Sequence, residues 1–409
     1  MVLSLINIVL LIVVLILADL VFYLLLLTIC AAFASQKTAK RASPPSHKFL
    51  LLIPAHNEET LLPKTLDNLN KLDYPQELYE IHVVADNCTD RTAELAREAG
   101  AVAHERFNTD LRGKGYALQW LLQRLWDSQV HHDALVIIDA DTVVSDNFLS
   151  VMDSRLAQGD RVIQAYYAVL DPEKSWGISL RYAALAVLHY LRPLGRMVLG
   201  GSTGLKGNGM VFRAEIMRER EWSSSLTEDI EFHMELVLDG ERVMFAPDAV
   251  VWAEMPETLA DSDTQNERWE QGRLEMAQTY VPKLLRGMVS NHEKYRGRRF
   301  MLFDAAMEHL IPPFSILAAS SAAVLIGATA LYLWQPTTLG TINLGLASFI
   351  LLGQIIYLFS GLVLAKAPAG VYKAMLYAPV FIAWKLLLYV RVLFGKKDDA
   401  WVRTARNEE

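Results

Sequence analysis

Two aspartates, Asp139 and Asp141, directly follow the apolar run Leu135–Ile138. A short run of this kind is typical of a buried strand, so both carboxylates are expected at the carboxyl end of that strand. Paired carboxylates can hold one hard divalent cation, which prefers oxygen ligands and keeps positions open for oxygens of another molecule. Acid pairs with this spacing also arise by chance, and the chain contains others. The strand that leads into Asp139 is the observation that favours a metal site here.

A third aspartate, Asp229, follows Ser225-Leu-Thr-Glu228, which has the spacing of a helix capping box. This spacing places Asp229 in the first turn of a helix that is expected to end at Asp239-Gly240. A carboxylate in that position can act as a general base, or it can simply interact favourably with the helix dipole. These residues alone leave both interpretations open.

Further along the chain, Gln265, Arg268 and Trp269 recur with helical spacing, which puts them on nearly one face of a helix. An arginine can bind a diphosphate through paired hydrogen bonds, and a neighbouring tryptophan can stack on a sugar ring. The same pattern also occurs on ordinary amphipathic surface helices.

Polar residues also follow two earlier apolar runs. Phe49–Ile53 leads into Pro54-Ala55-His56-Asn57-Glu58, and Ile81–Ala85 leads into Asp86-Asn87-Cys88. Each can be a strand end that runs into a helix cap, where Asn and Asp are common. Alternatively, the two segments form a nucleotide pocket in which Asp86 hydrogen-bonds the edge of a base.

The elements that must position these residues alternate along the chain. Strands expected at 49–53, 81–85 and 135–138 are separated at first by helical patterns at 58–72 and 90–98. Strand–helix alternation of this length predicts an α/β domain with a mostly parallel sheet. Ligands of such sheets bind beyond the carboxyl ends of the strands, where the motifs are expected to lie.

The ordered set of these motifs resembles family 2 glycosyltransferases. It consists of Pro54-Ala55-His56-Asn57-Glu58, Asp86, Lys114, Asp139-Ala140-Asp141, Thr227-Glu228-Asp229 and Gln265-x-x-Arg268-Trp269. More narrowly, it is similar to the membrane-integrated branch that includes cellulose, hyaluronan and chitin-oligosaccharide synthases and ceramide glucosyltransferase. The resemblance covers roughly residues 48–275. It implies a Rossmann-like GT-A fold and an inverting transfer from a nucleotide-sugar donor, with a UDP-sugar favoured.

The resemblance also implies roles for the residues on the donor side. Ala55 and Glu58 would line the nucleoside site, and Asp86 would read the base. Lys114 and Asp139 would face the nucleotide and its diphosphate.

On the reacting side, the resemblance implies that Asp141 binds Mg²⁺ or Mn²⁺. Asp229 would deprotonate the acceptor hydroxyl, which is a poor nucleophile without a base in hydrogen-bond reach. Gln265 and Arg268 would hold the departing diphosphate, which needs positive charge fixed in place. Trp269 would stack under the acceptor.

A glycine-rich segment, Gly200–Gly209, lies where the polymer synthases have their acceptor platform, so Asn208 is expected to contact the acceptor as well. Its glycines allow a ligand to approach the backbone closely. Because its residues differ from those of cellulose synthase, the identity of the acceptor is left open, as is whether the enzyme transfers one sugar or many in succession.

Apolar segments flank this region on both sides. Residues 1–34 contain one charge and exceed the roughly 20 apolar residues that a transmembrane helix needs. A cleaved signal peptide fits less well, because no basic stretch precedes this long run. Two further spans are expected at 310–334 and 342–365 within a membrane region at 309–395, followed by a polar tail at 396–409. Lysines, a proline and an arginine interrupt 372–394, so this segment either spans the membrane or lies re-entrant or interfacial.

The side of the membrane follows from the basic residues Lys37, Lys40 and Arg41, which come after the first span. By the positive-inside rule they place residues 48–275 in the cytoplasm. The protein is therefore expected in the plasma membrane, the inner membrane of a bacterium, as a multi-pass protein. Segments 175–199 and 280–303 mix aromatic residues with arginines, which predicts interfacial helices, the latter within residues 276–308. The alternative is ordinary amphipathic packing on the sheet.

Charge is distributed unevenly, because residues 48–307 carry −12 of a total net charge of −7 and both flanks are positive. An acidic domain is a poor partner for nucleic acid, whereas basic flanks suit anionic lipid. We therefore expect membrane lipids, and no nucleic acid, among the partners.

The acceptor has two expected identities. The first is a glycan, in the synthesis of extracellular or cell-envelope polysaccharide. The alternative is a lipid, of the ceramide or polyprenyl-phosphate type, because four or fewer spans make a wide polymer channel hard to build from one chain. A remote alternative is a non-catalytic membrane scaffold, against which the complete set of acids and the Arg268-Trp269 pair argue.

Overall fold

The structure is a computed structural model that describes residues 2–34, 44–128, 131–222, 225, 227–255 and 263–394. These residues form two compact units, which are described separately. The sheet unit is drawn from residues 44–171 and 200–306. The helical unit is drawn from residues 2–34, 172–199 and 307–394.

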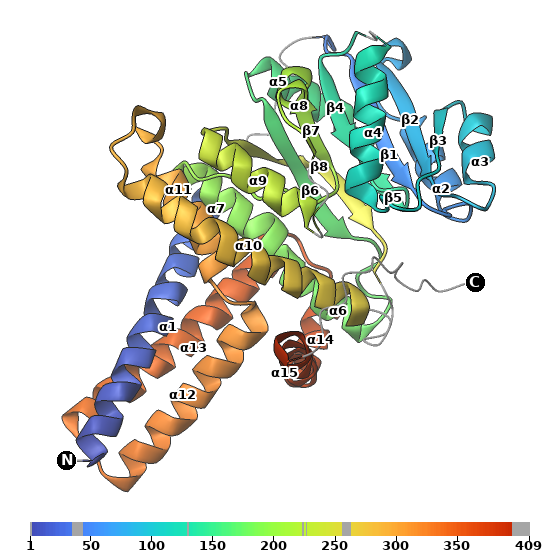
Figure 1. Cartoon of the computed structure of the whole chain (residues 1–409). Coiled ribbons are helices and arrows are strands. Elements are labelled where there is room, and N and C mark those ends of the chain that lie inside the picture. The colour runs from blue at the N-terminus through green and yellow to red at the C-terminus, as the bar shows by residue number, and fades with distance from the viewer. Residues whose placement is uncertain are drawn as a thin grey trace. The chain divides into compact units, whose positions relative to one another are not determined.

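The described part of the sheet unit contains one eight-stranded sheet with the order β3-β2-β1-β4-β7-β6-β8-β5 (Figure 1). The strands are β1 (Phe49–Ala55), β2 (Tyr79–Asp86), β3 (Val102–Arg106), β4 (Ala134–Ile137), β5 (Thr142–Val144), β6 (Val162–Val169), β7 (Met210–Arg213) and β8 (Val243–Ala253). Strands β3, β2, β1 and β4 are parallel, as are β6 and β8, whereas β7 and β5 run antiparallel to their neighbours. The prediction of an α/β domain with a mostly parallel sheet is confirmed.

Helices cover both faces of this sheet. On one face lie α2 (Leu62–Leu69), α3 (Thr92–Glu98) and α5 (Phe148–Ala157), and on the other lie α4 (Lys114–Asp127), α8 (Ala214–Arg218) and α9 (Glu228–Asp239). Two further helices, α10 (Asp263–Val289) and α11 (Arg299–Leu310), pack on α9, and short 3-10 turns lie at Gln76–Leu78 and Glu293–Tyr295. Alternate residues of β1 serve the two faces: Leu51 joins the core formed with α2, and Leu50 joins the core formed with α4. A strand buried on both faces explains why β1 is apolar without interruption.

The predicted start of the helix that carries Asp229 is wrong. The helix α9 begins at Glu228, and its N-cap residue is Thr227, whose side chain makes no capping hydrogen bond. Ser225 therefore does not cap it. Asp229 nevertheless lies in the first turn, and the helix ends at Gly240 in the left-handed conformation (φ 83°), as the sequence predicts.

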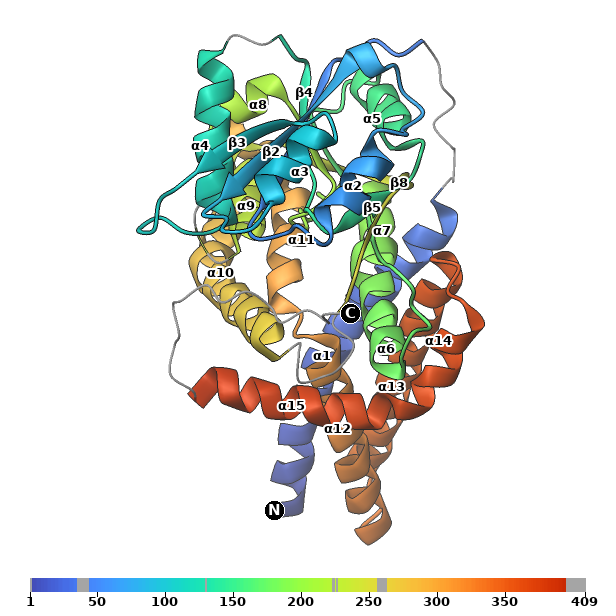
Figure 2. The ribbon, with the colours of Figure 1, turned by 90° about the vertical axis from the view of Figure 1, so that its right-hand side faces the viewer.

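The helical unit contains α1 (Val2–Phe33), α6 (Trp176–Ala186), a π-helical turn (Val187–Leu191), α7 (Arg192–Leu199), α12 (Phe314–Trp334), α13 (Thr338–Leu364), α14 (Ala369–Ala374), a 3-10 turn (Met375–Tyr377) and α15 (Ala378–Phe394). Four stretches of the described chain are long and apolar enough to cross a membrane: 3–33, 314–334, 338–364 and 369–392. Helices α1, α12 and α13 run alongside one another (Figures 1 and 2). Asn343 on α13 donates a hydrogen bond to the Asn7 carbonyl of α1 at 3.0 Å.

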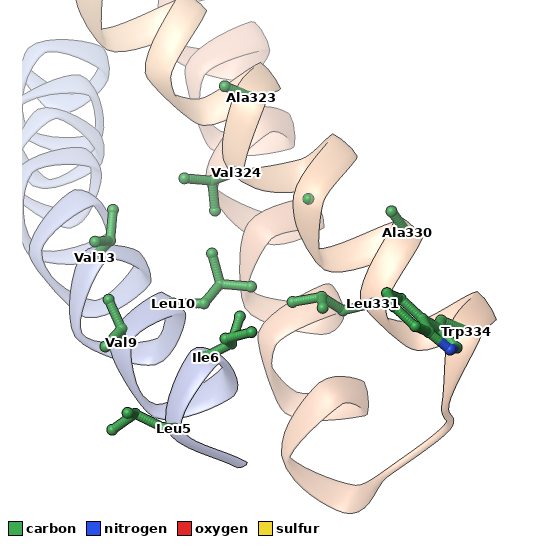
Figure 3. Close-up of a pocket in the computed structure, with 11 residues that line it drawn as sticks. Leu5, Ile6, Val9, Leu10, Val13, Ala323, Val324, Ala330, Leu331 and Trp334 are labelled. Atoms are coloured by element: carbon green, nitrogen blue, oxygen red, sulfur yellow. The ribbon is translucent and has the colours of Figure 1, made fainter. Parts of the chain in front are cut away.

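A groove of about 790 Å³ opens between α1 and α12 (Figure 3). Leu5, Leu10 and Val13 line one side, and Val324 and Leu331 line the other. Since its lining residues carry no ionisable group, the groove offers no group for acid–base chemistry.

Residues 172–199 interrupt the domain that the sequence predicts at 48–275, because they pack within the helical unit. Arg192 on α7 donates a hydrogen bond to the Tyr357 hydroxyl of α13 at 2.7 Å. Gly195 lies so close to the backbone of Leu27 that any side chain there would overlap it. Small residues allow helices to approach in this way. The alternative that this segment packs on the sheet is therefore wrong.

The second basic segment, 280–303, packs in the sheet unit. Tyr280 and Leu284 are buried in a cluster with Met234 and Val237 of α9. The buried face of this segment thus packs on α9, as in an ordinary amphipathic helix. Its position at the lipid surface stays a prediction. The charges at Lys37, Lys40 and Arg41 and the predicted tail at 396–409 lie outside the described residues.

Candidate active site

The parallel pairing of β1 and β2 brings the first two motifs together at one edge of the sheet. Ala55 pairs with Ala85, and His56 Nδ1 donates to the carbonyl of Asp86 at 2.6 Å. The backbone N–H of Glu58 donates to Thr92 Oγ1 at 2.8 Å, which ties the start of one loop to the helix that follows the other. The two loops that carry Ala55, Glu58 and Asp86 are thus tied together at one edge of the sheet.

Asp86 is held by a residue that the sequence motifs do not include. Arg106 Nη1 lies 2.5 Å from Asp86 Oδ1, and both side chains are buried. Arg106 also donates to the carbonyl of Leu111 at 2.8 Å, and Asn87 donates to Asp86 at 3.1 Å. Arg106 ends β3, where it pairs in register with Asp86. The sequence offers a weak signal for it, since β3 is short and partly exposed.

Lys114 lies at the centre of the site. Its ammonium group contacts the Asp139 carboxylate and donates to the carbonyl of Gly207 at 2.6 Å. It is the first residue of α4, after Gly113, whose φ of 119° favours glycine. Burial lowers the pKa of Lys114, but the carboxylates of Asp139 and Glu228 raise it further, so the net pKa lies above the ordinary value. The side chain is therefore a fixed cation.

Asn208 does not fit the predicted contact with the acceptor. Its side chain is fully buried, accepts from the backbone N–H of Asp139 at 3.2 Å and donates to Thr142 Oγ1 at 2.8 Å. Its backbone carbonyl accepts from Gln164 at 2.8 Å. Because both ends of its amide are engaged inside the protein, Asn208 instead attaches the glycine-rich segment to the strand end that carries Asp139.

Asp229 lies beside this segment. A Cβ at Gly207, where φ is 74°, would stand 3.5 Å from Asp229 Oδ2, so the glycine allows the carboxylate to lie close to the backbone of this segment. Burial raises the pKa of Asp229 above its ordinary value, although Lys114 and Lys206 lower it. Burial and the neighbouring Asp229 also raise the pKa of Glu228, to about 7. Two acids that share a site in this way titrate as a pair, and one of them can hold a proton near neutral pH.

The helix α10 brings Arg268 to the same place. Burial lowers the pKa of Arg268, and the nearby Glu228 opposes that shift. The close approach depends on Gly272, one turn further on, because a Cβ there would overlap the side chain of Thr227. Trp269 is 39% exposed and thus available to a ligand. The side chain of Gln265 lies outside the described residues.

Tyr167 on β6 is a further residue of the site that the motifs do not reveal. Burial, together with the carboxylates of Asp139, Asp141 and Asp229, raises its pKa above the ordinary value, so it stays a neutral phenol in the neighbourhood of these aspartates. It lies on a strand without a motif, and only the sheet order brings that strand to the site.

The carboxylates of Asp139 and Asp141 fit a divalent cation of the Mg²⁺ or Mn²⁺ type. No three His, Cys, Asp or Glu side chains converge on one metal position in the part of the chain that is described. Such cations are commonly held by one or two carboxylates together with phosphate oxygens of a substrate, rather than by a cage of protein ligands. Asp139 is already paired with Lys114, and Asp141 stays the predicted ligand.

Comparison with known proteins identifies the family of the chain. Residues 44–272 match the model of the family described as Glycosyltransferase like family 2. The chain is 27% identical over 264 residues to beta-monoglucosyldiacylglycerol synthase of Nostoc sp., with 62% of this chain and 54% of that protein covered. It is 26% identical over 270 residues to poly-beta-1,6-N-acetyl-D-glucosamine synthase of Staphylococcus aureus, with 64% and 60% covered. The chain thus spans little more than half the length of these relatives.

Solved structures show a more distant likeness. The mannosyltransferase PcManGT from Pyrobaculum calidifontis, in complex with GDP-Man and Mn²⁺, is 19% identical, with 86% of this chain and 99% of that chain covered and a TM-score of 0.49. S. aureus TarS 1–349 in complex with UDP-GlcNAc is 13% identical, with 78% and 91% covered and a TM-score of 0.44. The family match covers more than half of the chain and contains the strand-end motifs described above. The chain therefore belongs to glycosyltransferase family 2, and it is a glycosyltransferase with a GT-A fold.

Proposed function

We propose that this protein transfers a sugar, with inversion, from a nucleotide-sugar donor to a hydroxyl group of an acceptor that binds beside Gly207. The position of Asp229 carries this proposal. Its carboxylate is next to the uncovered backbone of Gly207, and Gly207 accepts a hydrogen bond from Lys114, which also contacts Asp139. The base and the group that faces the donor diphosphate therefore belong to one network.

The donor would bind along the strand ends. Ala55 and Glu58 would line its nucleoside, and Asp86 would hydrogen-bond the base edge. A carboxylate is an acceptor, so it suits the N–H of a uracil ring, which favours a UDP-sugar. Arg106 would hold Asp86 in position through their buried ion pair.

In the transfer step, Asp229 would take the proton of the acceptor hydroxyl. The hydroxyl oxygen would then form a bond to the anomeric carbon while the bond from that carbon to the diphosphate oxygen breaks on the opposite face. Lys114 and Arg268 would stabilise the negative charge that develops on the departing diphosphate. Asp141 would hold a divalent cation, which supplies further positive charge to that diphosphate. Gln265 is proposed to assist Arg268, and Trp269 to stack under the acceptor.

The acceptor is proposed to be a glycan in extracellular or cell-envelope polysaccharide synthesis. The S. aureus relative, a poly-beta-1,6-N-acetyl-D-glucosamine synthase, supports this choice. A lipid acceptor is the second candidate, because another relative is named as a synthase of a glucosyldiacylglycerol. The helical unit also favours the lipid, since the four candidate spans among the described residues are few for a polymer channel.

The membrane position is also part of the proposal. Helices α1, α12 and α13 are long and apolar enough to cross a bilayer, which supports the proposal of a multi-pass protein. The sheet unit is proposed to face the cytoplasm, where nucleotide-sugars are made, and the membrane is proposed to be the plasma membrane or, in a bacterium, the inner membrane.

The proposal can be tested with the full chain purified in lipid nanodiscs. A panel of UDP- and GDP-sugars would be supplied with Mn²⁺ and with candidate glycan and lipid acceptors, and the products would be analysed by mass and by NMR of the new linkage. The proposal expects a β-linked product from an α-linked UDP-sugar. A retained anomeric configuration would contradict inversion, and a lipid-bound monosaccharide as the sole product would exclude the glycan acceptor.

A further inference from the structure

We propose that α15 lies along the surface of the membrane and binds lipid through one exposed face, instead of crossing the bilayer. By length and composition, residues 369–392 qualify as a span. By direction they do not: α15 runs across α1, α12 and α13, which share one direction. Figure 1 shows α15 nearly end-on beside those three helices seen from the side, and Figure 2 shows it from the side.

The contacts of α15 place it at one end of the neighbouring span. The hydroxyl of Tyr389 lies 3.2 Å from the hydroxyl of Ser315, the second residue of α12. Since α12 has 21 residues, about the number needed to cross the hydrocarbon core, its first turn lies at the edge of that core. A helix that rests on Ser315 therefore lies at the boundary between hydrocarbon and headgroups.

The segment that leads into α15 lies at the corresponding end of α13. Tyr182 on α6 donates to the carbonyl of Ala365, the residue after α13, at 3.1 Å. Trp176, at the start of α6, packs on Tyr377 with 5.5 Å between the ring centroids. Because α12 leaves this boundary and α13 returns to it, both ends of α15 are held on the same side of the bundle.

The uncovered face of α15 and of the turn before it carries a row of apolar side chains. Leu388 and Tyr389 are buried against the bundle, whereas Leu376, Val380, Leu387 and Val390 are between 54% and 85% exposed. With the exposed Ala383, these residues recur every three or four positions, so they form one stripe along α15 and the 3-10 turn that precedes it. We name this stripe, residues 376, 380, 383, 387 and 390, the α15 stripe.

The polar residues of α15 suit the headgroup region. Lys385 lies 5.4 Å from the ring centroid of Trp384 and 6.0 Å from that of Tyr389, and Arg391 is exposed near the end of the helix. A spanning helix would carry Lys385 into the hydrocarbon core, which is costly for a charge. A helix in the plane of the interface keeps its cations with the phosphates while its apolar face enters the acyl boundary.

The occupant of the α15 stripe is thus the bilayer that surrounds α1, α12 and α13. A second copy of the chain is a weaker choice, because the stripe continues at the level where the neighbouring spans already meet lipid. The inference rests on the proposed membrane position and not on the proposed reaction. It reduces the crossings in the described part of the chain from four to three.

Depth measurements test this inference. Single cysteines would be placed at Val380, Ala383, Leu387 and Val390 in the full chain with Cys30→Ala and Cys88→Ala, labelled with a fluorophore and reconstituted in vesicles of phosphatidylglycerol and phosphatidylcholine. Quenching would be compared between lipids with a nitroxide near the headgroup and lipids with one near the end of the chain. The inference expects all four positions to lose fluorescence mainly to the shallow nitroxide, and to the same extent.

Matched controls come from α12, whose Ile326 and Leu333 are 70% and 75% exposed. Ile326 should be quenched mainly by the deep nitroxide and Leu333 by the shallow one. Deep quenching at Ala383 with shallow quenching at Val390 would show a spanning α15 and overturn the inference. Weak quenching at all four positions would show a protein contact and overturn it as well. Failure at Ile326 would contradict the membrane position itself.

Discussion

Lys114 donates a hydrogen bond to the carbonyl oxygen of Gly207 at 2.6 Å. The same ammonium group contacts Asp139, just after β4, and its positive charge lowers the pKa of Asp229. One side chain thus links the strand end assigned to the donor with the segment assigned to the acceptor. If the donor diphosphate binds Lys114 as proposed, a movement of this side chain would also shift the backbone of Gly207, next to the proposed base.

Lys114→Gln should lower kcat by about 100-fold, because the shorter, neutral amide no longer supplies charge to the diphosphate. The donor KM should rise as well. Steady-state transfer of a labelled sugar would measure both constants. Lys71→Gln, which removes an exposed lysine paired with Asp67, is the matched control and should leave them unchanged. Equal kinetics for the Lys114 variant and the control would refute the role of Lys114.

Gly272→Ala should impair transfer although residue 272 is proposed to touch neither substrate. The added Cβ overlaps Thr227, so α10 must move and carry Arg268 away from the site. We expect kcat to fall about tenfold, since small displacements of a positioned group are costly. Removing the overlapping atoms in the double variant with Thr227→Ala should restore part of the rate. Gly287→Ala, where the nearest atom would be 3.3 Å away, is the control on the same helix.

The first half of the sheet could be predicted from the sequence, because β1, β2 and β4 are buried on both faces and therefore read as continuous apolar runs. Motifs at their carboxyl ends then follow from the geometry of parallel sheets. Strands β6 and β7 carry no such motif. Their order, which inserts β7 antiparallel between β4 and β6, arises from long-range pairing that periodicity does not encode.

The site was predictable to a similar degree. Residues within motifs, such as Lys114 and Asp229, meet as expected, whereas Arg106 and Tyr167 join them only through strand register and sheet order. Asn208 was misplaced for a related reason. A polar residue among glycines suggests an exposed loop, but the hydrogen bonds to Asp139 and Thr142 hold it inside the protein.

The pH dependence of transfer should change in Glu228→Gln. In the native protein the pair formed by Glu228 and Asp229 gains a proton as the pH falls toward 7, since the pKa of Glu228 is raised to about 7 and that of Asp229 is also raised. Protonation removes the base, so activity declines on the acid side. Replacing Glu228 removes the neighbouring negative charge, while Lys114 and Lys206 still lower the pKa of Asp229. The acid limb of kcat/KM should therefore move to lower pH.

A profile of kcat/KM between pH 5 and 9 measures this shift, on the order of one pH unit for the loss of one close charge. Glu235→Gln, an exposed acid on the same helix, serves as the control. An acid limb that stays in place, or moves to higher pH, would contradict the coupling of the two acids.

Removal of divalent cations should abolish transfer, and Mn²⁺ or Mg²⁺ should restore it. Asp141→Asn should require a higher concentration of cation for half-maximal activity, about tenfold or more, because the main protein ligand is weakened. Asp146→Asn, a nearby exposed aspartate, should need the native concentration. Full activity in excess EDTA would show that Lys114 and Arg268 suffice to stabilise the diphosphate.

The central claim is that Asp229 is the base of a glycosyl transfer, and Asp229→Asn tests it most directly. The variant keeps the shape of the side chain but cannot take up the acceptor proton. We expect transfer from a labelled UDP-sugar to fall by about 10³-fold, while calorimetric binding of UDP with Mn²⁺ stays at the native affinity. Native rates of transfer by Asp229→Asn, with UDP bound as in the native protein, would contradict the account.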